Sequence, residues 1–156
     1  MFIENSKTGE KLKVEVLICV NAELRYLNGS KFEFDWLSKS SFTVYKLKTL
    51  SPNEILGLMS IDIIPSELRV EIRLLELSKE NVGRKRGFKN IAGILIAAAC
   101  KISFKMGFFG FVSLVPKTRL IEHYQKKYGF EQYGRHLAMD MEKSELLIKK
   151  YLEDAK

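Results

Sequence analysis

Apolar stretches of strand length, separated by turn residues, occupy the first half of the chain. In one of them apolar and polar positions alternate, which is the pattern of a half-buried β-strand. Asn-Gly, Ser-Pro-Asn and proline positions end the stretches. The pattern predicts four strands, at Leu12–Val20, Phe42–Lys48, Ile55–Ile64 and Leu68–Leu77, and the last three are expected to form an antiparallel meander. It also predicts one short helical turn, at Ala22–Leu27.

The second half of the chain alternates between helices and strands. It begins with a nearly all-apolar stretch, Ile91–Phe104, which predicts a buried helix. A strand, a helix, a strand and a terminal helix are expected after it, at Phe111–Val115, Thr118–Tyr128, Gln132–Met141 and Glu142–Leu152. Strands followed by a β-α-β-α-β half predict an α+β domain with a mixed sheet. We expect residues 1–156 to form a single domain.

Composition narrows the class of protein. The chain has 156 residues, 46% of them hydrophobic and 29% charged, which is typical of a globular domain. It has no apolar run of about 18 residues and no apolar N-terminal segment, so we expect a cytoplasmic protein without a membrane span. Cys19 and Cys100 lie in apolar stretches and are interpreted as small buried hydrophobes. With two histidines and no Cys-x-x-Cys motif, no metal site is expected.

The chain has a net charge of +7, and its densest group of cations lies in one loop, Lys79–Lys89. Its five cations and two glycines lie between a predicted strand and the start of the apolar helix. A basic loop before a helix N-terminus is typical of an anion site, because unpaired N–H groups and the helix dipole face the ligand. A phosphate or pyrophosphate is the expected ligand. A solvated loop and a nucleic-acid surface are the alternatives.

The order of residues in this loop excludes two common phosphate motifs. The chain has neither the GxxxxGK[ST] of a P-loop nor the GxGxxG of a dinucleotide fold. The segment instead resembles the acyl-CoA loop of the GNAT superfamily of N-acetyltransferases, [QR]-x-x-G-x-[GA]. The matching register is Gly87-x-x-Asn90-x-Ala92, followed by Gly93. Gly87 stands where Gln or Arg is usual, and Asn90 replaces the first glycine, a position at which Asn tolerates a positive φ.

A second segment strengthens the resemblance. The phrase HYQKKYGF, residues 123–130, is similar to the "fYeklGF" phrase that ends a later helix of the superfamily, although Tyr124 lies five residues before Gly129 where four is usual. The resemblance covers residues 54–141 and is closest to small bacterial members. It implies an α/β/α layered, mostly antiparallel central sheet flanked by helices. It also implies an acyl-CoA-dependent N-acyltransferase that uses acetyl-CoA, and no metal, to acetylate an amine on a small molecule or protein.

The resemblance also assigns residues. The loop and its flanks would hold acetyl-CoA through residues Leu77, Arg86, Gly87, Phe88, Lys89, Asn90, Ile91, Ala92 and Gly93. Tyr124 would protonate the leaving thiolate, unless it only packs on its helix. Glu76 is expected to be the general base, since a regular strand would place it on one face with Leu68, Val70, Ile72 and Leu74. A bulge would change that parity.

Each catalytic assignment has an alternative. Glu76 could form an ion pair with the basic loop, and Glu71 is then the second candidate base. His123 is a further candidate base or a surface residue, and His136 has no predicted role. The departures at Gly87 and Asn90 leave a second function open, a GNAT-like module that binds or senses CoA, with a nucleic acid as a candidate partner. A homodimer is also a candidate assembly.

Overall fold

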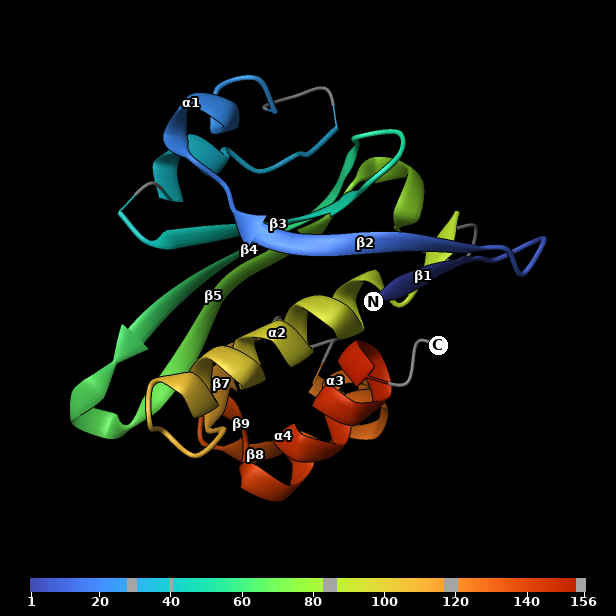
Figure 1. Cartoon of the computed structure of the whole chain (residues 1–156). Coiled ribbons are helices and arrows are strands. Elements are labelled where there is room, and N and C mark those ends of the chain that lie inside the picture. Colours follow the sequence, from blue (N-terminus) through green and yellow to red (C-terminus); the bar gives the residue numbers. More distant parts are fainter. Residues whose placement is uncertain (28–30, 40, 83–86, 117–120, 154–156) are drawn as a thin grey trace.

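A computed structural model of the protein describes residues 1–27, 31–39, 41–82, 87–116 and 121–153. Its centre is a nine-stranded sheet in the order β6-β1-β2-β3-β4-β5-β7-β9-β8 (Figure 1). The strands are β1 Phe2–Asn5, β2 Lys11–Ile18, β3 Thr43–Thr49, β4 Ile55–Ile64, β5 Arg69–Leu77, β6 Phe88–Lys89, β7 Val112–Leu114, β8 Glu131–Tyr133 and β9 His136–Met139. Only β5 and β7 are parallel among the described pairs. The predicted α+β class with a mixed, mostly antiparallel sheet is confirmed.

The helices are α1 Asn21–Leu24, α2 Ile91–Lys105, α3 Ile121–Tyr128 and α4 Met141–Ile148, with short turns at Trp36–Lys39, Pro65–Glu67, Lys79–Asn81 and Lys149–Glu153. One strand prediction is wrong. The strand expected at Gln132–Met141 is a hairpin of β8 and β9, because Gly134 turns the chain with φ +61°. The terminal helix expected at Glu142–Leu152 is α-helical only as far as Ile148, and a single π-helical turn, Lys149–Glu153, follows it. Thr118, the predicted start of α3, lies outside the described residues.

The larger core lies between the sheet and α2. This helix is apolar almost all round because the sheet covers one side and α4 packs on the other. Gly57 of β4 lets the helix approach closely, since a Cβ there would lie 2.9 Å from Ile91 Cγ2 and 3.0 Å from Leu95 Cδ1. The N-terminus of α2 is therefore fixed against the middle of the sheet.

A smaller core covers the opposite face of the sheet. The α1 segment and the turn Trp36–Lys39 bury Phe32 and Trp36 against Leu58 of β4. Leu74 of β5 packs at the edge of this cluster. Helical segments thus cover both faces of the sheet, as the α/β/α layering predicts.

A bulge in β5 divides that strand into two halves. Ser60 of β4 pairs with Leu74, but the next residue, Ile61, pairs with Ile72, so Arg73 is the extra residue. Beyond the bulge the parity reverses: Leu75 and Leu77 pack on the α2 side with Val70 and Ile72, whereas Leu74 and Glu76 face the opposite side. The expectation that Glu76 shares a face with Val70 and Ile72 is therefore wrong for this strand.

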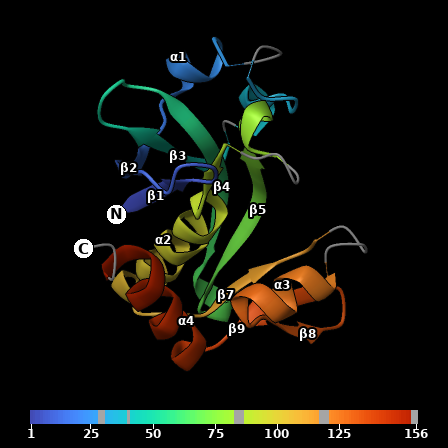
Figure 2. The ribbon, with the colours of Figure 1, turned by 90° about the vertical axis from the view of Figure 1, so that its right-hand side faces the viewer.

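The same strand borders an opening in the sheet. β7 pairs with β5 only at residues Val70, Glu71 and Ile72. Past Ile72, no described strand pairs with this edge of β5, and Figure 2 shows β7 turning away from it with α3 close by. The second half of β5 therefore has a free backbone edge inside the molecule.

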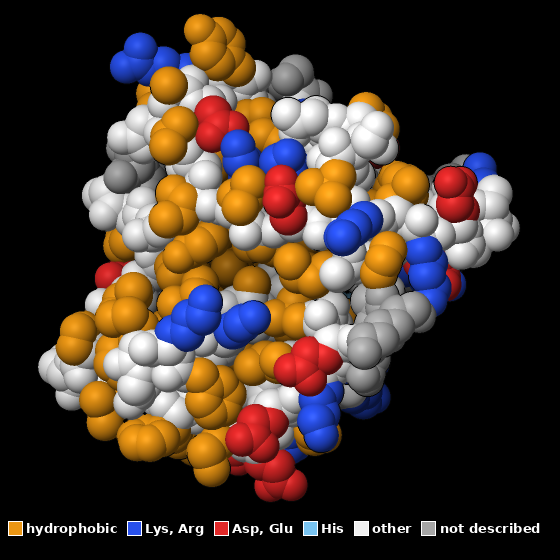
Figure 3. Space-filling view, in the orientation of Figure 1, with side chains coloured by type: hydrophobic (Ala, Val, Ile, Leu, Met, Phe, Trp, Pro, Cys, Tyr) orange, Lys and Arg blue, Asp and Glu red, His pale blue; other side chains and the backbone are white. Residues whose placement is uncertain are grey.

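The surface on the α2 side carries both signs of charge. Figure 3 shows hydrophobic side chains gathered in a hollow between the β2–β3 region and α2, with basic and acidic side chains scattered around it. Leu17 and Ile18 at the end of β2 are among the exposed large hydrophobic residues.

No helix in the described parts of the chain is long and apolar enough to cross a membrane.

Candidate functional site

A cavity of about 950 Å³ lies along the free edge of β5. β5, the first turn of α2, α3 and the loops at residues 33–34 and 79–82 all contribute to its walls. Its lining residues are Glu33, Phe34, Leu75, Glu76, Leu77, Lys79, Asn81, Val82, Phe88, Asn90, Ile91, Ala92, His123, Tyr124, Lys127, Tyr128 and Tyr151. An apolar cleft of this size with a few convergent polar groups is typical of a ligand site.

The N-terminus of α2 forms one end of the cavity. Asn90 precedes the helix with φ +80°, the left-handed conformation that its identity predicted. The first intrahelical bond runs from Ile94 N to Asn90 O at 3.0 Å. The N–H groups of Ile91, Ala92 and Gly93 precede it and lack an intrahelical acceptor. This end of the cavity therefore offers backbone donors and the positive end of a 15-residue helix.

Hydrogen bonds hold the two ends of the loop before α2. Asn81, 1% exposed, accepts a hydrogen bond from Phe88 N at 2.9 Å and donates to Ser78 Oγ at 2.8 Å. Phe88 and Lys89 form the short strand β6 against β1 rather than the expected loop, and Gly87 N donates to Glu80 O at 3.1 Å. Of the predicted contact residues, Leu77, Phe88, Asn90, Ile91 and Ala92 line the cavity. Gly87, Lys89 and Gly93 do not line it, and Arg86 lies outside the described residues.

Tyr124 lies across the cavity in a cluster of aromatic rings. Its ring centroid is 5.7 Å from that of His123, 6.0 Å from Tyr128 and 5.9 Å from Phe130. Burial raises the pKa of the Tyr124 hydroxyl, so the phenol stays protonated at neutral pH. His123 is exposed at the rim. The structure thus brings two of the three predicted catalytic residues together on one wall.

Glu76, the third, lines the cavity from β5 and is hydrogen-bonded to the segment 33–36. Its Oε2 accepts a hydrogen bond from Glu33 N at 2.7 Å, and its Oε1 accepts from Phe34 N at 3.3 Å and Trp36 Nε1 at 2.7 Å. Both oxygens are therefore engaged. The predicted alternative for Glu76, an ion pair with the basic loop, is not what the described residues show, because its partners are N–H groups of the segment before Lys39.

Tyr151 completes the cavity and was not predicted. It is 5% exposed, and its ring occupies the space beside Gly93, where a Cβ would lie 2.3 Å from Tyr151 Cε1. The glycine inside the α2 sequence was a signal of close approach, but nothing in the sequence indicated which residue approaches. The π-helical turn that carries Tyr151 directly follows α4.

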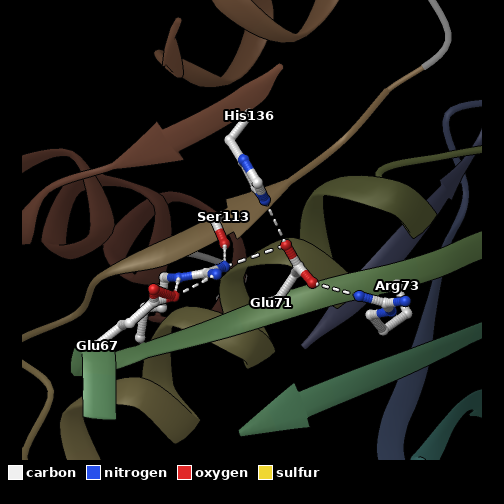
Figure 4. Close-up of polar contacts among 6 residues, drawn as sticks. Glu67, Glu71, Arg73, Ser113 and His136 are labelled. Atoms are coloured by element: carbon white, nitrogen blue, oxygen red, sulfur yellow. Dashed lines mark hydrogen bonds and ion pairs between the residues drawn. The ribbon is translucent and has the colours of Figure 1, made fainter. Parts of the chain in front are cut away.

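A second polar cluster lies on the face opposite α2 (Figure 4). Glu71 is buried at its centre and pairs with Arg69 at 3.1 Å, Arg73 at 2.6 Å and His136 Nε2 at 2.8 Å. Burial would raise the pKa of Glu71, but the hydrogen bonds from Arg73, Arg69 and His136 outweigh it and hold that pKa below its usual value. Glu71 was the second candidate for the general base, and His136 had no predicted role.

Neither cysteine is suited to nucleophilic catalysis. Cys19 and Cys100 are buried, and burial raises the pKa of each thiol to about 11. Both therefore act as small hydrophobes, as predicted. Within the described residues, no group of three or more His, Cys, Asp or Glu side chains is placed to hold a metal ion.

Comparisons with known proteins identify the fold. No protein-family model and no curated protein matches the sequence. Among solved structures, AtaT complexed with acetyl-methionyl-tRNAfMet matches with a TM-score of 0.60 and 14% identity over 87% of this chain and 99% of that one. A dodecameric spermidine N-acetyltransferase from Vibrio cholerae matches with 0.60 and 13% over 92% and 99%. An IAA acetyltransferase from Bacillus cereus matches with 0.55 and 14% over 78% and 79%. The chain therefore has the GNAT fold of these acetyltransferases, as its two sequence motifs predicted.

Proposed function

We propose that this protein is an acyl-CoA-dependent N-acyltransferase that transfers an acetyl group from acetyl-CoA to an amine of a small molecule or protein. One observation carries the proposal: a single cavity connects the first turn of α2, the free edge of β5 and the protonated Tyr124. The fold supports it, because two of the similar structures, from Vibrio cholerae and Bacillus cereus, are acetyltransferases by name.

The residues present suit the chemical groups of coenzyme A. Its pyrophosphate is an anion, for which the N–H groups of Ile91, Ala92 and Gly93 are the natural donors. Its pantetheine arm carries amides, which can hydrogen-bond to the unpaired edge of β5 as an added strand does. Lys79 and Lys127 add positive charge to the lining, and Phe88 adds apolar surface.

Tyr124 supplies the proton that the departing thiolate needs. The phenol is neutral because burial raises its pKa, so it can donate at neutral pH. The amine attacks the thioester carbonyl directly, so no covalent enzyme intermediate is formed and no metal is required. An alkylamine arrives protonated and must first lose a proton. Glu76 and His123 line the cavity and are the proton acceptors proposed from the sequence.

Acetyl-CoA binding tests the proposal. Thermal-shift titration should show stabilisation that weakens with added salt, because phosphate contacts are partly screened. Ala92→Val places two methyl groups in the cavity wall at the helix N-terminus and should weaken acetyl-CoA binding by about tenfold or more. Ala98→Val is the matched control, because it adds the same β-branched residue to the same helix away from the cavity.

The outcomes are distinct. Absence of any shift at millimolar acetyl-CoA would exclude the cofactor assignment, and equal binding by Ala92→Val and Ala98→Val would exclude the assigned α2 site. Binding without consumption of the thioester would favour the alternative, a GNAT-like CoA-binding or sensing module. A homodimer is proposed as well, and light scattering of the purified protein measures it.

A further inference from the structure

The Glu71–His136 pair joins two strands that are 65 residues apart in sequence. Glu71 is 4% exposed, and its Oε1 and Oε2 accept from Arg69 and Arg73 as well as from the imidazole (Figure 4). The His136 side chain is 41% exposed. A buried carboxylate therefore holds a histidine that is open to solvent.

The charge on Glu71 fixes which imidazole nitrogen carries the proton. Its lowered pKa keeps the carboxylate ionised, so it accepts hydrogen bonds only. His136 Nε2 is then the N–H donor at 2.8 Å, and the lone pair lies on Nδ1. Among the described residues, Nδ1 has no hydrogen-bond partner. The ring is thus an oriented base facing solvent.

The pair stands beside the opening in the sheet. Glu71 pairs with Ser113 of β7, one residue before the last rung at Ile72, and Arg73 is the bulge residue where the strands separate. Glu71 and His136 are on the face opposite α2, since their neighbours Ile72 and Leu137 belong to the larger core. A nucleophile that approaches over this face reaches the opening from the side opposite the α2 end of the cavity.

The two carboxylates that β5 places beside the opening, Glu71 and Glu76, have both oxygens engaged. Both oxygens of Glu76 accept N–H bonds from the 33–36 segment, and both oxygens of Glu71 are held by cations. A neutral imidazole held by its Nε2–H keeps the Nδ1 lone pair available for a proton. His136 is therefore a better placed base than Glu71 or Glu76.

We propose that His136, oriented by Glu71, accepts the proton of an alkylammonium acceptor that binds on this open face; this rests on the proposed acyltransferase function. Asp62 pairs directly with Glu71 on the same face, and Glu67 lies beside Arg69, so carboxylates are present to attract a cationic amine. His136 Nδ1 takes one ammonium proton, and the neutral amine then bonds to the thioester carbon. The C–S bond breaks, Tyr124 protonates the thiolate, and the second amine proton returns to the tyrosinate through solvent. One proton is released per amide formed.

The other titratable groups that face His136 come from β5 and β8. From β5, Glu71 and Arg69 face it, with Arg73 beyond them. From β8, Tyr133 is its cross-strand partner, and its hydroxyl donates to Glu131 Oε2 at 3.0 Å. That carboxylate raises the pKa of Tyr133, so the tyrosine stays neutral in the assay range. If the rate of Tyr133→Phe still changes between neutral and mildly basic pH as the wild-type rate does, the change is assigned to the Glu71–His136 pair and not to Tyr133.

The experiment compares two amines with acetyl-CoA as donor. n-Butylamine is protonated at neutral pH and needs a base, whereas methoxyamine is already neutral. His136→Gln retains an N–H donor for Glu71, so the cluster should stay folded. We expect kcat/KM for n-butylamine to fall by about 10²-fold at neutral pH and to recover as pH approaches the pKa of the amine. Transfer to methoxyamine and acetyl-CoA binding should not change, and Tyr133→Phe should keep the wild-type profile.

Glu71→Gln tests the positioning role of the carboxylate. It should reproduce part of the n-butylamine defect with the same recovery at high pH. An equal loss on both amines, or no recovery with pH, would overturn the assignment of His136 and leave the proposed function standing. Hydrolysis of acetyl-CoA by the wild type without acetylation of either amine would overturn the alkylamine class. Absence of both binding and turnover would overturn the proposed function and this inference with it.

Discussion

At the scale of single residues, the environment of Tyr124 decides whether it can act as an acid. Its ring packs against His123, Tyr128 and Phe130, and burial raises the pKa of its hydroxyl. A more weakly acidic phenol is almost fully protonated at neutral pH and can donate when a thiolate develops beside it. The same packing fixes the ring, so that the hydroxyl can be removed without leaving a cavity.

Tyr124→Phe should lower kcat for acetyl transfer by about 10²-fold while the KM for acetyl-CoA stays nearly constant, because the hydroxyl acts in the transition state. Steady-state kinetics measures both. Tyr45→Phe is the control, since Tyr45 on β3 is also half-buried with a pKa raised by burial but does not line the cavity. Unchanged turnover in Tyr124→Phe would remove Tyr124 from the reaction, and His123 would be tested next.

Sequence predicted single residues well where the cause is local. Asn90 was expected to tolerate a positive φ, and it has φ +80°, because that preference depends on the residue itself. Gly93 shows the limit: its missing Cβ makes room for Tyr151, 58 residues later, and no local pattern reveals such a partner. His136 acquires its partner Glu71 only when β9 is placed beside β7.

At the scale of elements, β5 organises the site. Its first half pairs with β7, its bulge at Arg73 reverses the parity, and its second half lines the cavity. The sequence predicted the strand to within one residue, because its apolar run is bounded by Pro65 and the basic loop. It could not place the bulge, since a bulge depends on how β4 pairs with the strand. For that reason Glu76 was assigned to the wrong face.

Glu76→Gln tests the anchor that this reversed parity creates. Three N–H groups, from Glu33, Phe34 and Trp36, now donate to the two carboxylate oxygens of Glu76. The glutamine amide has only one acceptor oxygen for them. Leaving a donor unsatisfied should cost about 1–3 kcal/mol of unfolding free energy, and KM should rise because Glu33 and Phe34 line the cavity. Urea unfolding and steady-state kinetics measure the two effects.

Glu54→Gln is the control for this substitution, because Glu54 makes a more exposed ion pair with Lys31 and should lose less than about 1 kcal/mol. Wild-type stability of Glu76→Gln would contradict the anchoring role, and a role as general base would be seen in the kinetics. The rising acidic limb of its pH–rate profile would then flatten.

At the scale of the whole molecule, the sheet separates two kinds of chemistry. The cavity and the α2 N-terminus offer donors for an anionic ligand, and the opposite face carries the Glu71 cluster. The order of strands and helices was predictable from hydrophobic periods, because each element needs an apolar face of its own. The hairpin after Gly129, the strand β6 and the π-helical turn were missed, because short elements are defined by their pairing rather than by their sequence.

The Glu71 cluster also ties strands β5, β7 and β9 together, which gives the whole fold an acid sensitivity. The folded-state pKa of Glu71 lies below the ordinary value of 4.5, so its stabilisation is present above that pH and is lost as pH falls through the folded pKa. Glu71→Gln should reduce the unfolding free energy at pH 7 by about 1–3 kcal/mol and flatten its decline below pH 4.5. Urea unfolding at a series of pH values measures both.

Glu67→Gln is the control, because Glu67 pairs with the same Arg69 but is 52% exposed, and it should keep the wild-type curve. Parallel stability curves for Glu71→Gln and the wild type would show that the acid sensitivity arises elsewhere in the fold.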